Sequence, residues 1–181
     1  MSLYPMVRLS ILALIATVAV AQESSVNPGI NASYLSEDMI VADWVERLER
    51  EGREVADNRD EIVAQIGIEP GIDIADIGTG TGLFLPTLTA AVGPKGKVFA
   101  VDIIEKFLAH VDTHIERRGW KNVETVLCTE RSTELAPNSI DLAFICNVYH
   151  HFEYPNDTLA SLHQALRPGG RIVLIDFKRI P

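Results

Sequence analysis

The residues best suited to chemistry lie in a glycine-rich segment, GTGTG at residues 78–82, which follows a short β-branched run. Glycines at a turn from a strand into a helix allow close approach of a ligand and tolerate positive φ angles. The helix that follows offers free N–H groups and the positive end of its dipole. Asp102 ends the next apolar run, where a carboxylate can accept hydrogen bonds from ribose hydroxyls. Together these features predict a nucleoside-binding site.

The elements that must position these residues alternate between strand and helix. Short apolar runs rich in Val and Ile predict strands at residues 72–77, 97–102, 123–129, 140–147 and 171–177. Apolar residues at helical spacing predict helices after the glycine segment, over residues 104–118, and from Asn156 or Asp157 onward. Near-continuous apolar strands alternating with helices indicate an α/β fold, in which helices cover both faces of a parallel sheet.

The segment before the first strand has two parts. Residues 1–21 carry one basic side chain, a short apolar run and an A-x-A pattern, which are typical of a secretory signal peptide. We therefore expect export to the periplasm or the extracellular space, with no stable membrane span after cleavage; the alternative is an uncleaved membrane anchor. Residues 22–54 predict a linker and a cap helix with Ser36 as its N-cap, in which Trp44 covers the sheet or the ligand cleft. Residues 55–181 form the predicted ligand-binding domain.

The composition argues against several other classes of protein. The 181 residues include 16 Lys and Arg against 25 Asp and Glu, a formal net charge of −9. This balance lacks the basic surface that neutralises nucleic-acid phosphates, so no nucleic-acid partner is expected. The two cysteines, Cys128 and Cys146, are too few for a disulfide scaffold or a multi-cysteine zinc site, and no metal is expected. In the expected sheet they lie too far apart for a disulfide, which predicts two free thiols.

Four segments together resemble the class I S-adenosylmethionine-dependent methyltransferases. They are ADIGTGTG, VFAVDI, SIDLAFICNVYHHF and LRPGGRIVLIDF, and they extend along most of residues 72–177. The resemblance implies a Rossmann-like, doubly wound sheet of order 3-2-1-4-5 with an N-terminal helical cap. It also implies S-adenosyl-L-methionine as the cofactor and a small molecule or a protein as the methyl acceptor. By the same resemblance, the cofactor would be bound by Asp76, Gly78, Thr79, Gly80, Gly82, Asp102, Ile103, Glu130 and Asn147.

The resemblance also suggests individual roles. Asp76 would interact with the amino-acid end of the cofactor or support the glycine segment. Asp102 would bind the ribose hydroxyls, and Ile103 would pack on the adenine. Glu130 is the candidate for the acidic residue that reads the adenine amino group in this family.

Candidate catalytic residues follow the fourth predicted strand. Open α/β sheets bind ligands at the carboxyl ends of their strands, where Tyr149, His150 and His151 occur. One histidine could take a proton from the methyl acceptor. The alternative is a structural loop, because displacement from a sulfonium can proceed by proximity and alignment alone. Arg53 and Arg59 could reach an anionic substrate or form surface ion pairs.

Two other functions fit part of the pattern. An NAD-type oxidoreductase would use the fingerprint G-x-G-x-x-G, but position 83 holds Leu83 instead of the third glycine. The other alternative is a truncated, non-catalytic nucleotide-binding module. The family's sheet usually ends in a hairpin of strands six and seven, whereas this sequence stops four residues after Phe177. We therefore expect either a fragment or a fifth strand whose edge pairs with another chain.

Overall fold

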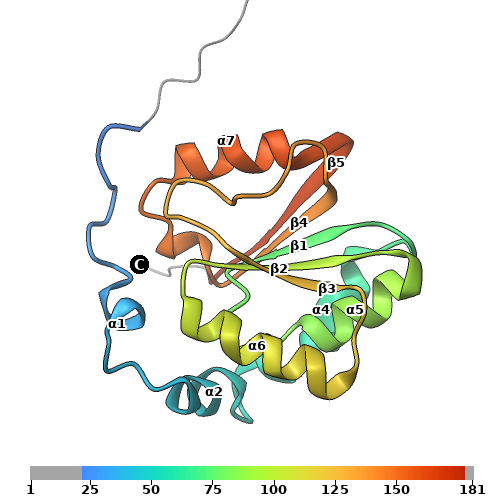
Figure 1. The fold of residues 1–181 in the computed structure, drawn as a ribbon, viewed down its shortest axis with the longest axis horizontal. Coiled ribbons are helices and arrows are strands. Elements are labelled where there is room, and N and C mark those ends of the chain that lie inside the picture. The colour runs from blue at the N-terminus through green and yellow to red at the C-terminus, as the bar shows by residue number, and fades with distance from the viewer. Residues whose placement is uncertain (1–21, 178–181) are drawn as a thin grey trace, which may run out of the picture.

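The computed structural model describes residues 22–177, so the predicted signal peptide at residues 1–21 lies outside the described chain. The strands are β1 (Ile74–Ile77), β2 (Val98–Asp102), β3 (Val123–Leu127), β4 (Ile140–Cys146) and β5 (Leu166–Ile175). All neighbouring strands pair in parallel, in the order β3-β2-β1-β4-β5 (Figure 1). The predicted α/β class and strand order are therefore confirmed.

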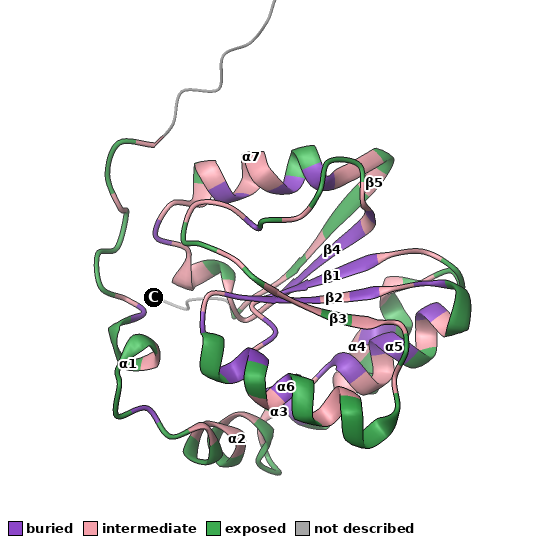
Figure 2. Ribbon diagram, viewed as in Figure 1, coloured by how far each residue is buried: buried purple, intermediate pink, exposed green. Residues whose placement is uncertain are grey.

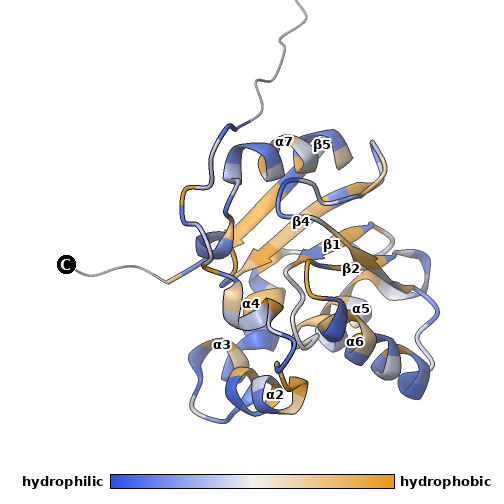
Figure 3. Ribbon diagram, turned by 60° about the vertical axis from the view of Figure 1, so that its left-hand side comes forward, coloured by the Kyte–Doolittle hydropathy of each residue, from blue (hydrophilic) through white to orange (hydrophobic). Residues whose placement is uncertain are grey.

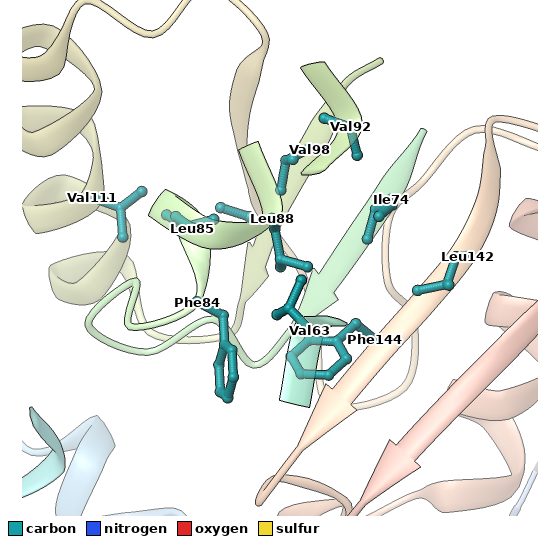
Figure 4. Close-up of a cluster of buried hydrophobic side chains, with 11 residues drawn as sticks. Val63, Ile74, Phe84, Leu85, Leu88, Val92, Val98, Val111, Leu142 and Phe144 are labelled. Carbon is teal, nitrogen blue, oxygen red and sulfur yellow. The ribbon is translucent and has the colours of Figure 1, made fainter. Parts of the chain in front are cut away.

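Helices cover the two faces of this sheet. The helices are α1 (Ala32–Leu35), α2 (Val41–Glu49), α3 (Glu54–Asp57), α4 (Arg59–Ile66), α5 (Leu85–Val92), α6 (Glu105–Arg118) and α7 (Pro155–Ala165), of which α4 to α7 pack on the sheet. On one face, Val63 of α4, Leu88 of α5 and Val111 of α6 pack in one buried cluster with strand residues (Figure 4). On the other face, Leu162 and Ala165 of α7 pack against β1 and β4. The two clusters hold the sheet as a rigid layer between them.

Burial is deepest in the central strands (Figure 2). All four residues of β1 are buried, and Ile77 at its carboxyl end pairs with Val101 of β2 and Ile145 of β4. This register brings the carboxyl ends of the three strands to the same edge of the sheet. The outer strand β5 is apolar like its neighbours (Figure 3), yet Ile172 and Leu174 remain exposed there.

Two predicted helix starts are wrong. Ser36 follows α1 in an extended conformation, and α2 begins only after Ile40, so Ser36 does not cap it. Helix α7 begins at Pro155 and has Tyr154 in its N-cap position. The two predicted caps, Asn156 and Asp157, both lie inside the helix, and the Asp157 carboxylate instead accepts hydrogen bonds from Gln22 N and from the Arg131 guanidinium.

The N-terminal part of the described chain runs across the carboxyl ends of the strands (Figure 1). Val26 N donates to Glu153 O (2.9 Å), near the start of α7. Further along, Lys106 Nζ on α6 donates to Met39 O (3.2 Å). We call residues 22–40 the N-terminal strap, because its hydrogen bonds connect it to both sides of the sheet. No helix among residues 22–177 combines the length and the apolar character needed to cross a bilayer.

Candidate active site

The glycine segment turns sharply at the carboxyl end of β1. Gly78 and Gly80 have φ angles of 67° and 54°, in the left-handed region that favours glycine. The N–H groups of Gly78 and Thr79 both donate to Val101 O, at 2.8 and 3.0 Å, which fixes the turn against β2. A Cβ on Gly78 would lie 2.7 Å from Val148 Cγ2, so the space beside this glycine is already filled.

Asp76 supports the glycine segment from beneath. Its carboxylate is buried and accepts a 2.7 Å hydrogen bond from Thr79 Oγ1. Burial raises the pKa of Asp76 to about 7, although the hydrogen bond from Thr79 opposes this shift. Of the two roles expected for Asp76, this hydrogen bond shows the second, which is to support the glycine segment.

Asp102 faces the same turn from the end of β2. Its Oδ2 accepts a hydrogen bond from Gly80 N (2.8 Å) and its Oδ1 accepts one from Ile104 N (2.9 Å). Burial raises the pKa of Asp102 to about 6, while these backbone N–H groups favour the ionised form. The backbone N–H of Ile103 also favours the ionised carboxylate. A carboxylate has about four lone-pair positions, so Asp102 can still accept a hydrogen bond from a ribose hydroxyl.

A cleft opens between the glycine turn and the loops that follow β2, β3 and β4. Most predicted cofactor-binding residues line it, namely Asp76, Gly78, Thr79, Gly80, Asp102, Ile103, Glu130 and Asn147. Gly82 does not line the cleft. It allows close packing instead, because a Cβ there would lie 3.0 Å from Leu85 Cδ1 and 3.3 Å from Val111 Cγ2.

One wall of the cleft comes from the N-terminal region, which was expected to form a cap. Its residues include Asn31, Tyr34, Leu48 and Arg53, of which only Arg53 was a candidate from the sequence. Asn31 is buried, and its Nδ2 donates to His151 O (3.0 Å) while its Oδ1 lies 3.2 Å from His151 Nδ1. Tyr34 stacks on Trp44 with a centroid distance of 4.2 Å. The strap is therefore a structural part of the cleft.

A second cavity adjoins the cleft. Both are lined by Tyr34, Leu48, Arg53, Asn147 and His151, so these residues form a shared wall. The second cavity is also lined by His150, Arg47 and Arg50. Arg59 lies outside both cavities, and its Nη1 donates to Ala56 O (2.9 Å).

The three predicted catalytic residues differ in their placement. His151 lines both cavities and His150 lines the second one, whereas Tyr149 lines neither and packs on Phe152 with a centroid distance of 5.4 Å. Burial and the neighbouring His150 lower the pKa of His151, which favours its neutral form.

His150 forms a dyad with Asp176, a residue that the sequence reasoning missed. His150 Nδ1 lies 3.0 Å from both carboxylate oxygens of Asp176, and His150 N donates to Oδ2 at 3.3 Å. Burial opposes ionisation of Asp176, but the hydrogen bonds from His150 and Phe177 N hold its pKa below the ordinary value. An ionised carboxylate on Nδ1 orients the imidazole and leaves Nε2 to act as a proton acceptor.

Both cysteines are free thiols that line the cofactor cleft. Burial, followed by the charge of a nearby aspartate, raises the pKa of Cys128 and of Cys146 to about 12. Both are therefore neutral near pH 7, and neither has the thiolate character that a nucleophile needs.

The sequence of this chain is similar to those of known methyltransferases. A family described as "Methyltransferase domain" matches residues 75–174. Among curated proteins, "Ubiquinone/menaquinone biosynthesis C-methyltransferase UbiE" of Cupriavidus taiwanensis is 25% identical over 118 residues, which is 65% of this chain and 48% of that protein. The protein of the same name from Ectopseudomonas mendocina is 28% identical over 114 residues, 62% of this chain and 44% of its own length. The chain thus spans about half the length of the curated relatives it matches.

A solved structure supports the same assignment. The "SAM dependent methyltransferase from Aquifex aeolicus" superimposes with a TM-score of 0.65 and 28% identity, covering 72% of this chain and 69% of that one. The oxidoreductase alternative receives no support from these comparisons. The family match extends over more than half of the sequence and includes β1 with its glycine turn and the end of β2. The chain therefore belongs to the methyltransferase-domain family, and its fold is that of the class I S-adenosylmethionine-dependent methyltransferases.

Proposed function

We propose that the chain binds S-adenosyl-L-methionine in the cleft and transfers its methyl group to an acceptor in the second cavity. The observation that carries the proposal is the position of Asp102. Its carboxylate is held 2.8 Å from Gly80 N at the end of β2 and retains lone-pair capacity for a ribose hydroxyl. A second observation is the wall shared by the two cavities, because the acceptor must lie next to the cofactor.

The residues of the cleft suit this cofactor. Asp76 and Asp102 are buried carboxyl groups at its floor, so a cationic sulfonium compound would meet negative rather than positive charge there. The backbone of Gly80 is open on the cleft side, where an added Cβ would meet only Leu48 Cδ1, at 3.9 Å, among side chains. Ile103 offers an apolar surface for the adenine.

The bound cofactor would supply an electrophilic methyl group, and the chain supplies alignment and proton transfer. Tyr34 and Leu48 contribute side chains to the wall between the two cavities. We assign His150 as the general base of the reaction and Asp176 as the residue that positions it. With Asp176 accepting a hydrogen bond from Nδ1–H, Nε2 of His150 is free to take a proton from the acceptor.

The curated relatives suggest which kind of atom receives the methyl group. Their name specifies C-methyltransferase activity in ubiquinone and menaquinone biosynthesis. We extend to this chain only the reaction type, methylation of a carbon atom. A carbon atom becomes nucleophilic enough when it loses a proton, or when a hydroxyl group conjugated with it loses one. A histidine–aspartate dyad beside the shared wall could remove that proton.

A thermal-unfolding titration tests the cofactor assignment. S-adenosylhomocysteine at 100 times its dissociation constant should stabilise the folded protein by about 2.7 kcal/mol, and NAD⁺ at the same concentration should not. A folded protein that responds only to NAD⁺, or to neither compound, would contradict the proposal.

Two variants test the dyad. His150→Gln should lower kcat at least tenfold with an unchanged affinity for S-adenosylhomocysteine. Asp176→Asn should change the pH profile of kcat, because the neutral amide no longer favours a proton on Nδ1. Wild-type kcat and a wild-type pH profile in both variants would exclude this role.

We also propose that residues 1–21 direct export and are removed. Gln22 N lies 2.7 Å from Asp157 Oδ1, so cleavage after residue 21 would place a new ammonium group beside a carboxylate. Mass spectrometry of the protein from its native host should find Gln22 at the N-terminus. Intact residues 1–21 on a protein in the cytoplasm would contradict the proposal.

A further inference from the structure

We infer that the methyl acceptor is a small anion, with a carboxylate or phosphate group on an apolar or aromatic body. The inference rests on the proposed function and adds the chemical class of the acceptor. Arg47, Arg50 and Arg53, which line the second cavity, would bind its anionic group.

The charge of the cavity is the first argument. Arg47, Arg50 and Arg53 line it, and no Asp or Glu does. Within residues 22–177, no carboxylate lies within 4.0 Å of any of these three guanidinium groups. This concentration of positive charge occurs in a chain with a formal net charge of −9. A cavity of one sign in a protein of the opposite sign attracts an anionic ligand.

Two of the three arginines make contacts that position them. Arg53 Nη1 donates to Leu48 O (2.8 Å), which fixes one guanidinium at the wall shared with the cofactor cleft. Arg47 lies over the Trp44 ring, 4.9 Å from its centroid. Guanidinium groups bind carboxylate and phosphate oxygens through paired hydrogen bonds, so two or three of them can fix one anionic group in a defined orientation.

The rest of the lining accounts for the body of the ligand. Ile30, Tyr34, Trp44, Leu48 and Phe177 contribute apolar or aromatic surface to the same cavity. An anionic group bound by Arg47 and Arg50, which line only the second cavity, would leave the body of the ligand toward the shared wall. The cavity therefore combines anion binding with a position next to both the base and the methyl group.

Matched probes test this inference. We would titrate the wild-type protein, saturated with S-adenosylhomocysteine, with 4-hydroxybenzoate, phenyl phosphate and the neutral 4-hydroxybenzamide, and measure binding by calorimetry up to 10 mM. At least one of the two anions should bind at least tenfold more tightly than the amide, and the stronger of them identifies the preferred group. No anion binding up to 10 mM, or equal binding of the amide, would overturn the inference.

Variants locate the site. Arg50→Gln should weaken binding of the preferred anion at least threefold, and the triple variant Arg47→Gln/Arg50→Gln/Arg53→Gln should weaken it at least thirtyfold. Arg117→Gln, an equal charge change on the exposed end of α6, is the matched control and should bind like the wild type. Unchanged binding in Arg50→Gln and the triple variant would overturn the inference, and Arg50→Gln alone decides it if the triple variant fails to fold.

The two proposals fail in different ways. The affinity for S-adenosylhomocysteine is measured separately on the same samples. Loss of anion binding with intact nucleoside binding overturns only the acceptor class. Absence of nucleoside binding overturns the proposed function, whatever the anions do.

Discussion

Replacing Asp102 with asparagine should weaken cofactor binding while it leaves the stability of the fold nearly unchanged. The carboxylate is buried, and burial raises its pKa to about 6 from an ordinary value of 3.8. At pH 7.5 the ionised group thus costs the folded protein about 3 kcal/mol, since each pKa unit corresponds to about 1.4 kcal/mol. Asparagine removes this cost. It also replaces one carboxylate oxygen with an amino group, so either Gly80 N or Ile104 N loses its acceptor.

A lost acceptor for a buried N–H costs about 1–3 kcal/mol, which nearly cancels the gain. We therefore expect the free energy of unfolding of Asp102→Asn to lie within about 2 kcal/mol of the wild-type value. The affinity for S-adenosylhomocysteine should fall about 10- to 100-fold, because a hydrogen bond to a charged group contributes about 1.5–3 kcal/mol.

Denaturant unfolding without ligand and calorimetry with S-adenosylhomocysteine measure the two quantities. Asp38→Asn is the matched control, because Asp38 is exposed and should leave both quantities unchanged. The reasoning is refuted if folded Asp102→Asn binds with wild-type affinity. It is also refuted if the variant loses more than about 4 kcal/mol of stability, since the carboxylate would then act mainly in the fold.

Two further predictions follow from the same region. Gly78→Ala should lower the free energy of unfolding by several kcal/mol, because φ is 67° and the new Cβ would meet Val148. Gly119→Ala is the control: it has the same φ and no atom within 4 Å, so it should lower the free energy of unfolding by only about 1 kcal/mol. Equal losses of stability in denaturant unfolding would contradict this prediction. The ligand-free protein should lose stability as the pH rises from about 4 to about 7, because Asp76 and Asp102 have raised pKa values and bind more protons in the folded state than in the unfolded state. The lowered pKa values of His114 and His151 oppose this trend, and we expect the two buried carboxyl groups to outweigh them. Urea midpoints that are constant or rise across this pH range would contradict the prediction.

The sheet and the floor of the cleft were predictable because their signals are local. Strand composition, the glycine turn and Asp102 lie within about 30 residues of one another in sequence, and parallel pairing brings them to one edge. The helix starts at Ser36 and Asp157 were wrong for a different reason. Their side chains fit the general preference for a cap, but Asp157 bonds instead to Gln22 and Arg131, which only the folded chain brings near.

The strap and the dyad depend on contacts that no local pattern encodes. Asn31 reaches His151 across 120 residues of sequence, and Asp176 reaches His150 across 26. The sequence around Asp176 is typical of the end of an apolar strand, and the sequence around Asn31 is typical of a linker rich in turns. Their roles follow from the tertiary arrangement of β4, β5 and the N-terminal strap.

The most direct test of the central claim is a crystal structure of the protein with S-adenosylhomocysteine. We predict that both ribose hydroxyls lie within 3.2 Å of the Asp102 carboxylate, with the amino-acid end beside Gly78 and the sulfur facing the wall shared with the second cavity. A nucleoside bound elsewhere, or a ribose turned away from Asp102, would contradict the account.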